Sequence, residues 1–127
     1  MSISNAMAVE WTSIIKDSEH EVFVDIDSYN VSDNLPFLVA KTVYASPQPF
    51  ALPDQKTQYS ISMAKFQFNC QQPLYRIRTI QLLNKKDVLI DTIKLNSGFQ
   101  TLTVNTDEFS IGQLTCQVHQ MLGGASI

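Results

Sequence analysis

The chain has 127 residues, of which 44% are hydrophobic and 17% charged, and its formal net charge is −3 at pH 7. This length suits one domain with a single hydrophobic core, and the composition excludes an intrinsically disordered chain. The slight negative charge gives no reason to expect a nucleic-acid partner, and no apolar run approaches the length of a membrane-spanning helix.

Residues 1–8 differ from the rest of the chain. Ser4-Asn5-Ala6 resembles the remnant that is left when an affinity tag is cleaved, so we interpret 1–8 as a tag remnant or a disordered N-terminus. This stretch lacks both the basic and the apolar part of a signal peptide. If the protein is exported, its signal segment is absent from this chain. We expect one domain over residues 9–124 and a short tail at 125–127.

Stretches of alternating apolar and polar residues, separated by turn-forming residues, predict six or seven strands joined mostly by hairpins. The expected strands cover residues 10–16, 21–26, 37–45, 57–70, 74–83 and 88–95, with a last short strand at Leu102 and Val104. Asn84-Lys85-Lys86-Asp87 is the strongest hairpin signal. The apolar parity changes within the strand at 57–70, which predicts a bulge near Ala64 and Lys65.

Two polar stretches are predicted to lie outside the strands. Residues 27–34 are rich in Asp, Ser and Asn, which favour turns. Residues 46–54 hold three prolines, which lack the backbone donor that a sheet needs, and therefore predict a surface loop. A proline-rich recognition segment is the alternative interpretation of this second stretch.

The C-terminal residues predict one amphipathic helix that ends at Gly123-Gly124. Asn105 or Ser110 is expected to cap its start. The residues of its apolar stripe are Ile111, Leu114, Val118 and Met121. Cys116 projects about 160–200° away from this stripe, at roughly 100° per residue. The predicted fold is therefore α+β, with an antiparallel meander sheet of six or seven strands and one C-terminal helix.

The cysteine count alone leaves two states open. Cys70 ends the central predicted strand and Cys116 lies on the helix, and the pair forms either two buried thiols or one disulfide. A bond would close a loop of about 46 residues and stabilise the fold by roughly 4 kcal/mol on the chain-entropy model. Two distant cysteines and two lone histidines are too few ligands for a metal site.

Charge is unevenly distributed along the chain. Residues 1–55 hold two basic and eight acidic side chains, whereas residues 56–94 hold seven basic side chains against Asp87 and Asp91. Six of these basic residues are candidates for binding a partner: Lys56, Lys65, Arg76, Arg78, Lys85 and Lys86. The alternative is that they form a solvated outer face of the sheet.

No catalytic motif is present in the sequence. His20 lies in a polar turn and His119 on the flank of the helix, and neither has a Ser, Cys or Asp at a spacing typical of a triad. Asp25 and Asp27 share a strand face, but we interpret Asp27 as the start of an Asx turn rather than as a metal ligand. We therefore predict that the protein is not an enzyme and carries no metal.

Over residues 9–122 the chain resembles the bacterial surface-adhesin protein E family. The likeness consists of a short first strand followed by a set of motifs in a fixed order. These motifs are Val24-Asp25-Ile26-Asp27-Ser28, Tyr59, Asn69-Cys70, the strand at 74–79, the stretch from Leu102 to Asp107, and Cys116. The resemblance implies an antiparallel sheet whose C-terminal helix is tethered by a disulfide between Cys70 and Cys116.

The resemblance also implies a location and partners. Family members are exported to the periplasm, the outer membrane or the cell surface, and are often lipid-anchored. The characterised adhesin self-associates and binds host matrix proteins and haem. Its matrix-binding stretch is densely basic, whereas the equivalent residues 52–68 keep only Lys56 and Lys65 and add Asp54.

Two functions are therefore expected. The first is a non-catalytic exported module that binds a host matrix protein or an envelope protein through its exposed sheet face or the proline-rich loop, with a homodimer as a further expectation. The alternative is a periplasmic binding or inhibitor module for a small ligand or an envelope enzyme. No cofactor is expected beyond the haem that the resemblance suggests.

Overall fold

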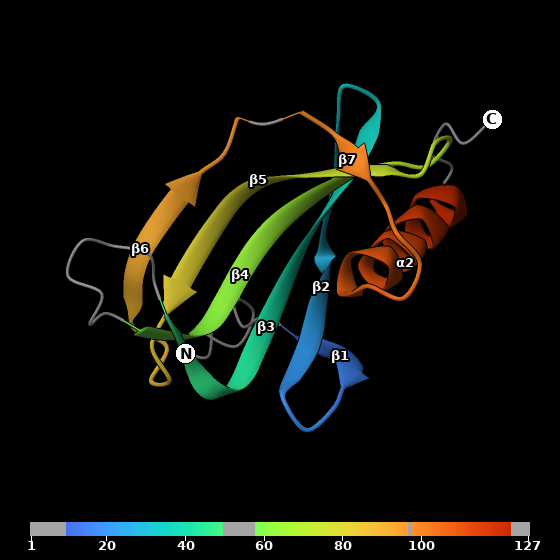
Figure 1. The fold of residues 1–127 in the computed structure, drawn as a ribbon. Coiled ribbons are helices and arrows are strands. Elements are labelled where there is room, and N and C mark those ends of the chain that lie inside the picture. The colour runs from blue at the N-terminus through green and yellow to red at the C-terminus, as the bar shows by residue number, and fades with distance from the viewer. Residues whose placement is uncertain (1–9, 50–57, 97, 123–127) are drawn as a thin grey trace, which may run out of the picture.

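The computed structural model describes residues 10–49, 58–96 and 98–122, which form a curved sheet with one helix packed on it (Figure 1). The strands are β1 (Thr12–Lys16), β2 (His20–Ser32), β3 (Leu35–Pro49), β4 (Gln58–Asn69), β5 (Leu74–Leu83), β6 (Leu89–Lys94) and β7 (Gln100–Thr101), and the helix is α2 (Asp107–Met121). This helix is too short and too polar to cross a membrane, and the described residues contain no other candidate.

The sheet is the predicted antiparallel meander. Strands β1 to β6 lie side by side in the order of the sequence, and each pairs antiparallel with the next. The short β7 pairs antiparallel with the start of β5. Local pairing of this kind needs only tight connections such as the turn at Asn84, where the side chain accepts hydrogen bonds from the backbone of Lys86 and Val88.

The predicted turn at residues 27–34 is wrong for most of its length, because β2 continues to Ser32. The pairing of β2 with β3 shifts register between Asp25 and Asn30. At the shift, the Ser28 hydroxyl donates to the Asp25 carbonyl at 2.6 Å and accepts from the Val39 amide at 2.8 Å. Polar side chains therefore replace ladder hydrogen bonds here, and the strand passes through the irregularity instead of ending.

The predicted loop at 46–54 is wrong for its first four residues, because β3 extends through Pro47 to Pro49. The pairing of β2 with β3 ends at Tyr44, and the Ala45 amide donates to the Glu19 carbonyl at 2.9 Å. Beyond Ala45, no described strand pairs with β3 on that side. A proline that lacks a backbone N–H is tolerated at such an edge. Residues 50–57, and with them Lys56 and most of the proline-rich stretch, lie outside the described residues.

The sheet register shifts at the predicted position, but the bulge predicted within β4 is wrong in its strand, because the extra residue lies on β5. Lys65 pairs with Thr79 and Phe66 pairs with Ile77, which leaves Arg78 of β5 as the unpaired residue. The last predicted strand is displaced. β7 covers Gln100–Thr101, whereas Val104 lies in a turn with 61% of its surface exposed.

Neither expected residue caps helix α2, because its N-cap lies one residue after Asn105 and four residues before Ser110. Thr106 is the N-cap, and its hydroxyl accepts a hydrogen bond from the Phe109 amide at 3.2 Å. Asn105 instead adopts a positive φ of 69° before the helix starts. Asp107 and Glu108 occupy the first turn, where the helix dipole favours negative charge. The expected end at Gly123-Gly124 lies outside the described residues.

The buried face of α2 differs from the predicted apolar stripe. Met121 is 76% exposed, and the buried residues are Ile111, Gly112, Thr115 and His119. The two polar residues are satisfied, because the Thr115 hydroxyl donates to the Ile111 carbonyl at 2.7 Å and His119 Nδ1 lies 2.6 Å from the Tyr29 hydroxyl. Gly112 allows the close approach, since a Cβ there would lie 2.9 Å from the Phe68 ring.

This rotation of the helix explains how Cys116 reaches the sheet. Cys116 bonds to Cys70, which directly follows β4, and the two Cα atoms are 5.6 Å apart. If the predicted apolar stripe of the helix faced the sheet, Cys116 would point away from the sheet. With Thr115 on the buried face instead, Cys116 lies beside the packed residues. The disulfide tether between strand region and helix is therefore present.

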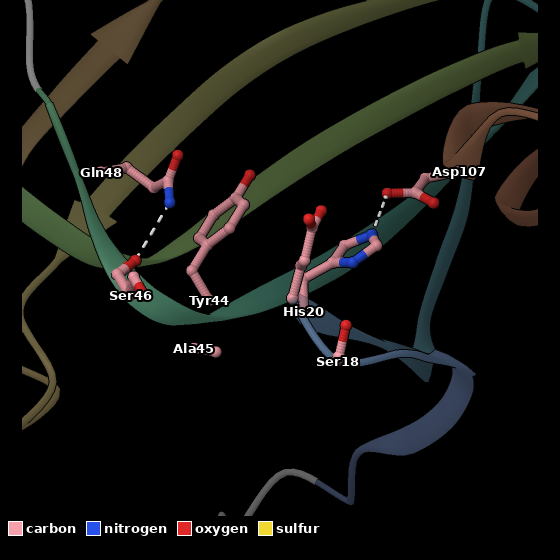
Figure 2. Close-up of a pocket in the computed structure, with 8 residues that line it drawn as sticks. Ser18, His20, Tyr44, Ala45, Ser46, Gln48 and Asp107 are labelled. Carbon is pink, nitrogen blue, oxygen red and sulfur yellow. Dashed lines mark hydrogen bonds and ion pairs between the residues drawn. The ribbon is translucent and has the colours of Figure 1, made fainter.

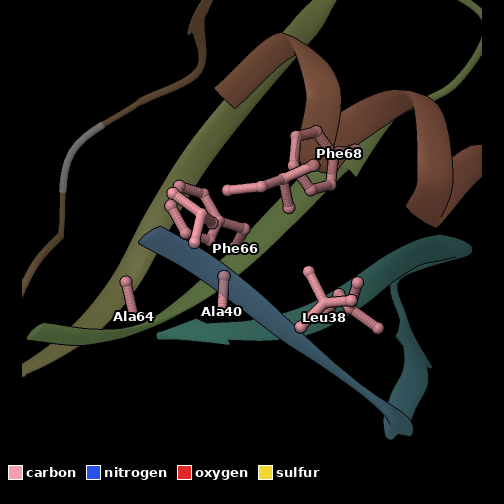
Figure 3. Packing of buried hydrophobic residues seen from close by; sticks show 8 residues of the cluster. Leu38, Ala40, Ala64, Phe66 and Phe68 are labelled. Carbon is pink, nitrogen blue, oxygen red and sulfur yellow. The ribbon is translucent and has the colours of Figure 1, made fainter. Parts of the chain in front are cut away.

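The core lies between α2 and the concave face of the sheet. Phe68 and Leu38 are fully buried, and the Phe66 and Phe68 rings stack with centroids 6.0 Å apart. Figure 3 shows Phe68 next to the helix, with Leu38 and Ala40 on the adjacent strand. The alternating residues of β2 to β5 on this face pack into one cluster, as the strand parity predicts.

Candidate functional site

Helix α2 covers only part of the concave face. The helix packs on β1 to β4, at the end of the sheet beside β7, while β6 lies on the far side of the sheet (Figure 1). The uncovered part, which we call the open half, forms a groove of about 390 Å³. Its floor consists of Ile77, Ile80 and Leu82 of β5 and Ile93 of β6.

One end of this groove is aromatic and acidic. Tyr44 and Tyr59 meet edge to face with ring centroids 5.9 Å apart, and Asp107 and Glu108 line the groove from the first turn of α2. The pKa of Tyr44 is raised, chiefly by its burial and also by the neighbouring Tyr59. The phenol therefore stays protonated at neutral pH and offers a hydroxyl within an otherwise acidic end.

A second hollow, of about 510 Å³, adjoins the groove and shares Tyr44 and Asp107 with it (Figure 2). Here His20 stacks beside Tyr44 with ring centroids 6.3 Å apart. His20 Nδ1 lies 2.9 Å from Asp17 Oδ1, and its Nε2 lies 2.8 Å from Asp107 Oδ2. The residues Ser18 and Glu19 complete the polar rim.

The carboxylates of Asp17 and Asp107 favour the protonated form of His20. The hydrogen bond to Asp17, followed by the one to Asp107, raises the pKa of His20, and the same hydrogen bond from His20 lowers the pKa of Asp17. A protonated imidazole can donate to both carboxylates, whereas a neutral ring has only one N–H. In its protonated form, His20 therefore links the turn between β1 and β2 to the first turn of α2 through two charge-assisted hydrogen bonds.

The candidate basic residues do not form one patch. Lys65 and Arg78 line a hollow of about 340 Å³ on the convex face, together with Lys94. Thr79 pairs with Lys65 on one side and with Lys94 on the other, so three adjacent strands contribute to this site. We call Lys65, Arg78 and Lys94 the convex basic cluster. Lys94 is a site residue that sequence analysis missed, although the hairpin pairing places it in this row.

Lys56 lies outside the described residues, and the other three candidates lie away from this cluster. Arg76 donates from Nε to Gln67 Oε1 at 2.8 Å and its guanidinium lies 4.5 Å from the Phe99 ring centroid. Gln67 is fully buried, so Arg76 is tied into the structure of the sheet. Lys85 and Lys86 lie in the turn after β5, roughly 20 Å along the strand from Thr79 at about 3.4 Å per residue.

The histidines do not fit a haem in their observed arrangement. Both ring nitrogens of His20 face carboxylates, and His119 is only 3% exposed, on the buried face of α2. A haem would need other ligands or a displaced His20, so haem binding stays an expectation that depends on the resemblance alone. Among the described residues, no group of three His, Cys, Asp or Glu side chains is arranged to hold a metal ion.

The Asx turn near Asp25 is formed differently from the prediction. The Asp25 carboxylate, rather than that of Asp27, accepts the local hydrogen bond, from the Asp27 amide at 3.1 Å. Asp25 therefore starts the turn, and its carboxylate is engaged with the local backbone.

Comparisons with models of known families, with curated proteins and with solved structures found no match for this chain.

Proposed function

We propose that the protein is an exported, non-catalytic binding module of the surface-adhesin E type, and that its convex basic cluster binds an acidic segment of a protein partner. The disulfide between Cys70 and Cys116 supports export, because such bonds persist in oxidising compartments and are rare in the cytosol. The motifs that resemble the adhesin E family support the same compartment and a partner that is a host matrix protein or an envelope protein.

The observation that carries this proposal is the concentration of positive charge at one point of the convex face. Three cationic side chains from adjacent strands surround one hollow, whose other described residues are Phe37, Thr79, Leu95 and Asn96. Lys65 and Lys94 are two strands apart, roughly 10 Å at the usual strand spacing. Like charges at such distances repel, so an anionic partner group between them gains energy from all three.

One member of the cluster is also held in position. Lys65 Nζ lies 4.7 Å from the centroid of the Phe37 ring, and Phe37 is buried. A cation–π contact of this kind limits the rotamers of the lysine without neutralising its charge. The described residues place no carboxylate within 4.0 Å of Lys65, Arg78 or Lys94, so the cluster is available to a partner.

The proposal is tested by measuring the binding of a labelled glutamate-rich peptide to the oxidised protein by fluorescence anisotropy. The double variant Lys65→Glu/Lys94→Glu is compared with Lys85→Glu/Lys86→Glu, which changes the net charge by the same amount. We expect the first variant to weaken binding by at least about tenfold, the effect of 1.4 kcal/mol. The hairpin variant is expected to change binding by less than about threefold.

Two results would contradict the proposal. Equal losses in both double variants would show that the peptide responds only to net charge. Absence of saturable binding at low ionic strength would show that the cluster does not bind acidic peptide at all.

A second candidate function is the binding of a small ligand in the groove of the open half. The specific observation in its favour is that Ile77, Ile80 and Ile93 line a hollow of the size that small-molecule sites usually have, and that tyrosine and carboxylate side chains line the same hollow. This function depends on the concave face and is independent of the convex basic cluster.

A further inference from the structure

We propose that the groove of the open half binds an amphipathic organic cation, with an apolar body on β5 and β6 and an ammonium group between Tyr44, Tyr59 and Glu108. This inference rests on the second candidate function, small-ligand binding, and specifies the chemical class of the ligand. It does not depend on the convex basic cluster.

The floor of the groove favours a ligand with an apolar body. Ile77, Ile80 and Ile93 point into the groove and are only partly buried, whereas the equivalent residues beneath α2 are closed off from water. Covering apolar surface yields about 25 cal/mol per Å². An alkyl or aryl body of the ligand can therefore take the place that α2 occupies over the rest of the concave face.

The acidic end of the groove selects the charge of the ligand. Asp107 and Glu108 line the groove, Glu19 lines the adjoining hollow, and the described residues of both linings include neither lysine nor arginine. His20 contributes one positive charge when protonated, but Asp17 and Asp107 flank it on both sides. The net charge at this end is therefore negative.

The positive pole of the α2 dipole does not make the net charge at the acidic end of the groove positive. It amounts to about half an elementary charge, which is less than the combined charge of the two carboxylates in the first turn. Glu108 makes no ion pair among the described residues, so its charge is available to a ligand. An anionic ligand would be repelled at this position.

The tyrosines add a second feature that favours a cation. Tyr44 and Tyr59 are arranged edge to face beside the carboxylates, which leaves ring surface directed toward the groove. Aromatic faces attract ammonium groups, and the attraction is stronger where water is excluded. Aromatic rings combined with carboxylates form the kind of site that recognises alkylammonium groups.

The test uses three probes with the same alkyl chain and different head groups, all below the concentrations at which they form micelles. Octyltrimethylammonium, 1-octanol and octyl sulfate are each titrated into the oxidised protein by isothermal titration calorimetry. We expect saturable binding of the cation, at least about tenfold tighter than that of the alcohol, and no saturable binding of the sulfate.

A pair of matched variants locates the head group. Glu108→Gln removes the one of the two groove carboxylates that makes no ion pair among the described residues, and is expected to weaken cation binding about fivefold while leaving octanol binding unchanged. Asp87→Asn is the control, because it removes one carboxylate in the β5–β6 turn, where asparagine suits the positive φ of 66°. The control is expected to leave both affinities unchanged. Circular dichroism of each variant checks the fold.

The outcomes separate this inference from the function on which it rests. Equal affinity for cation and alcohol would overturn the ligand class but leave small-ligand binding in place. Absence of binding by all three probes would overturn both. Equal losses in Glu108→Gln and Asp87→Asn would show that only the overall charge matters and would overturn the proposed position of the ammonium group.

Discussion

The two halves of the concave face share one strand pattern but differ in how deeply their side chains are buried. Both consist of alternating apolar residues on antiparallel strands. Beneath α2, Phe68 and Leu38 are fully buried, whereas Ile77, Ile80 and Ile93 of the open half remain partly exposed. The difference arises from the position of one helix, which the disulfide and the close contact at Gly112 fix at one end of the sheet. The covered half therefore supplies stability, and we infer that the open half is where a ligand binds.

The largest expected effect contrasts one residue from each half. We predict that Phe68→Ala lowers the free energy of unfolding by about 3–5 kcal/mol, because it removes a fully buried ring and leaves a cavity under α2. Ile93→Ala, which removes a partly exposed side chain, is expected to cost roughly 1 kcal/mol. Urea unfolding of the oxidised variants measures both values. Similar costs at the two positions would mean that both halves are equally closed in solution.

The disulfide is expected to have an effect of comparable size. Replacing Cys70 and Cys116 by serine together opens a loop of 46 residues and should lower stability by about 4 kcal/mol on the chain-entropy model. The measurement is thermal unfolding of the double variant beside the oxidised wild type. Before this comparison, mass spectrometry without reductant should find the wild type lighter than its free-thiol form by two hydrogen atoms. A stability change near zero would show that packing alone holds α2 in place.

Substitution of Gly112 tests how closely α2 approaches the sheet. Alanine favours helix over glycine by roughly 1 kcal/mol, but its Cβ would lie 2.9 Å from a Phe68 ring atom and 3.0 Å from Leu102 Cδ2. Because the Phe68 ring is fully buried and cannot move aside, we predict that Gly112→Ala is destabilising by about 1–2 kcal/mol. Gly98→Ala is the matched control, since nothing lies within 4 Å of a Cβ there. If Gly112→Ala were stabilising, helix propensity would outweigh the contact.

The smallest expected effect is the pH dependence of stability that arises from His20. The pKa of His20 is raised in the folded protein by Asp17 and Asp107. Its contribution to stability is therefore fully present below the ordinary histidine pKa of about 6.5, and is lost as the pH rises through the raised value. We predict that the melting temperature falls over this range, by an amount that corresponds to about 0.5–1 kcal/mol for a partly exposed pair.

Variants check this assignment. Asp107→Asn removes the second of the two hydrogen bonds that raise the pKa of His20 and should reduce the pH dependence above about 6.5, whereas Asp87→Asn should leave its slope unchanged. The pKa of Asp17 is lowered, so its own contribution is present above the ordinary aspartate value of about 3.9 and is lost as the pH falls further. A slope in Asp107→Asn equal to that of the wild type would assign the titration to another group.

The sequence predicted the sheet well because its signals are local. Alternation within each strand and the turn at Asn84–Asp87 are short-range features, and they determined strand order and pairing. The errors lie where tertiary context overrides a local preference. Ser28 supplies hydrogen bonds that keep β2 intact through a turn-like stretch, and the open edge of β3 tolerates Pro47 and Pro49.

The sites were less predictable because they depend on how elements pack. The apolar stripe of the helix was the reasonable guess for its buried face, but Thr115 and His119 are buried instead, with hydrogen bonds that no sequence pattern shows. The groove exists only because α2 lies to one side. Lys94 joins Lys65 through strand register across three strands, so the convex basic cluster was only partly visible in the sequence.

The most direct test of the difference between the two halves is methyl chemical-shift mapping by nuclear magnetic resonance during a titration with octyltrimethylammonium. We predict saturable shifts of the methyl signals of Ile77, Ile80 and Ile93, with those of the fully buried Leu38 and Val24 nearly unmoved because α2 stays in place. Equal shifts beneath the helix, or saturation with no shifts in the open half, would contradict the assignment of that half as the ligand site.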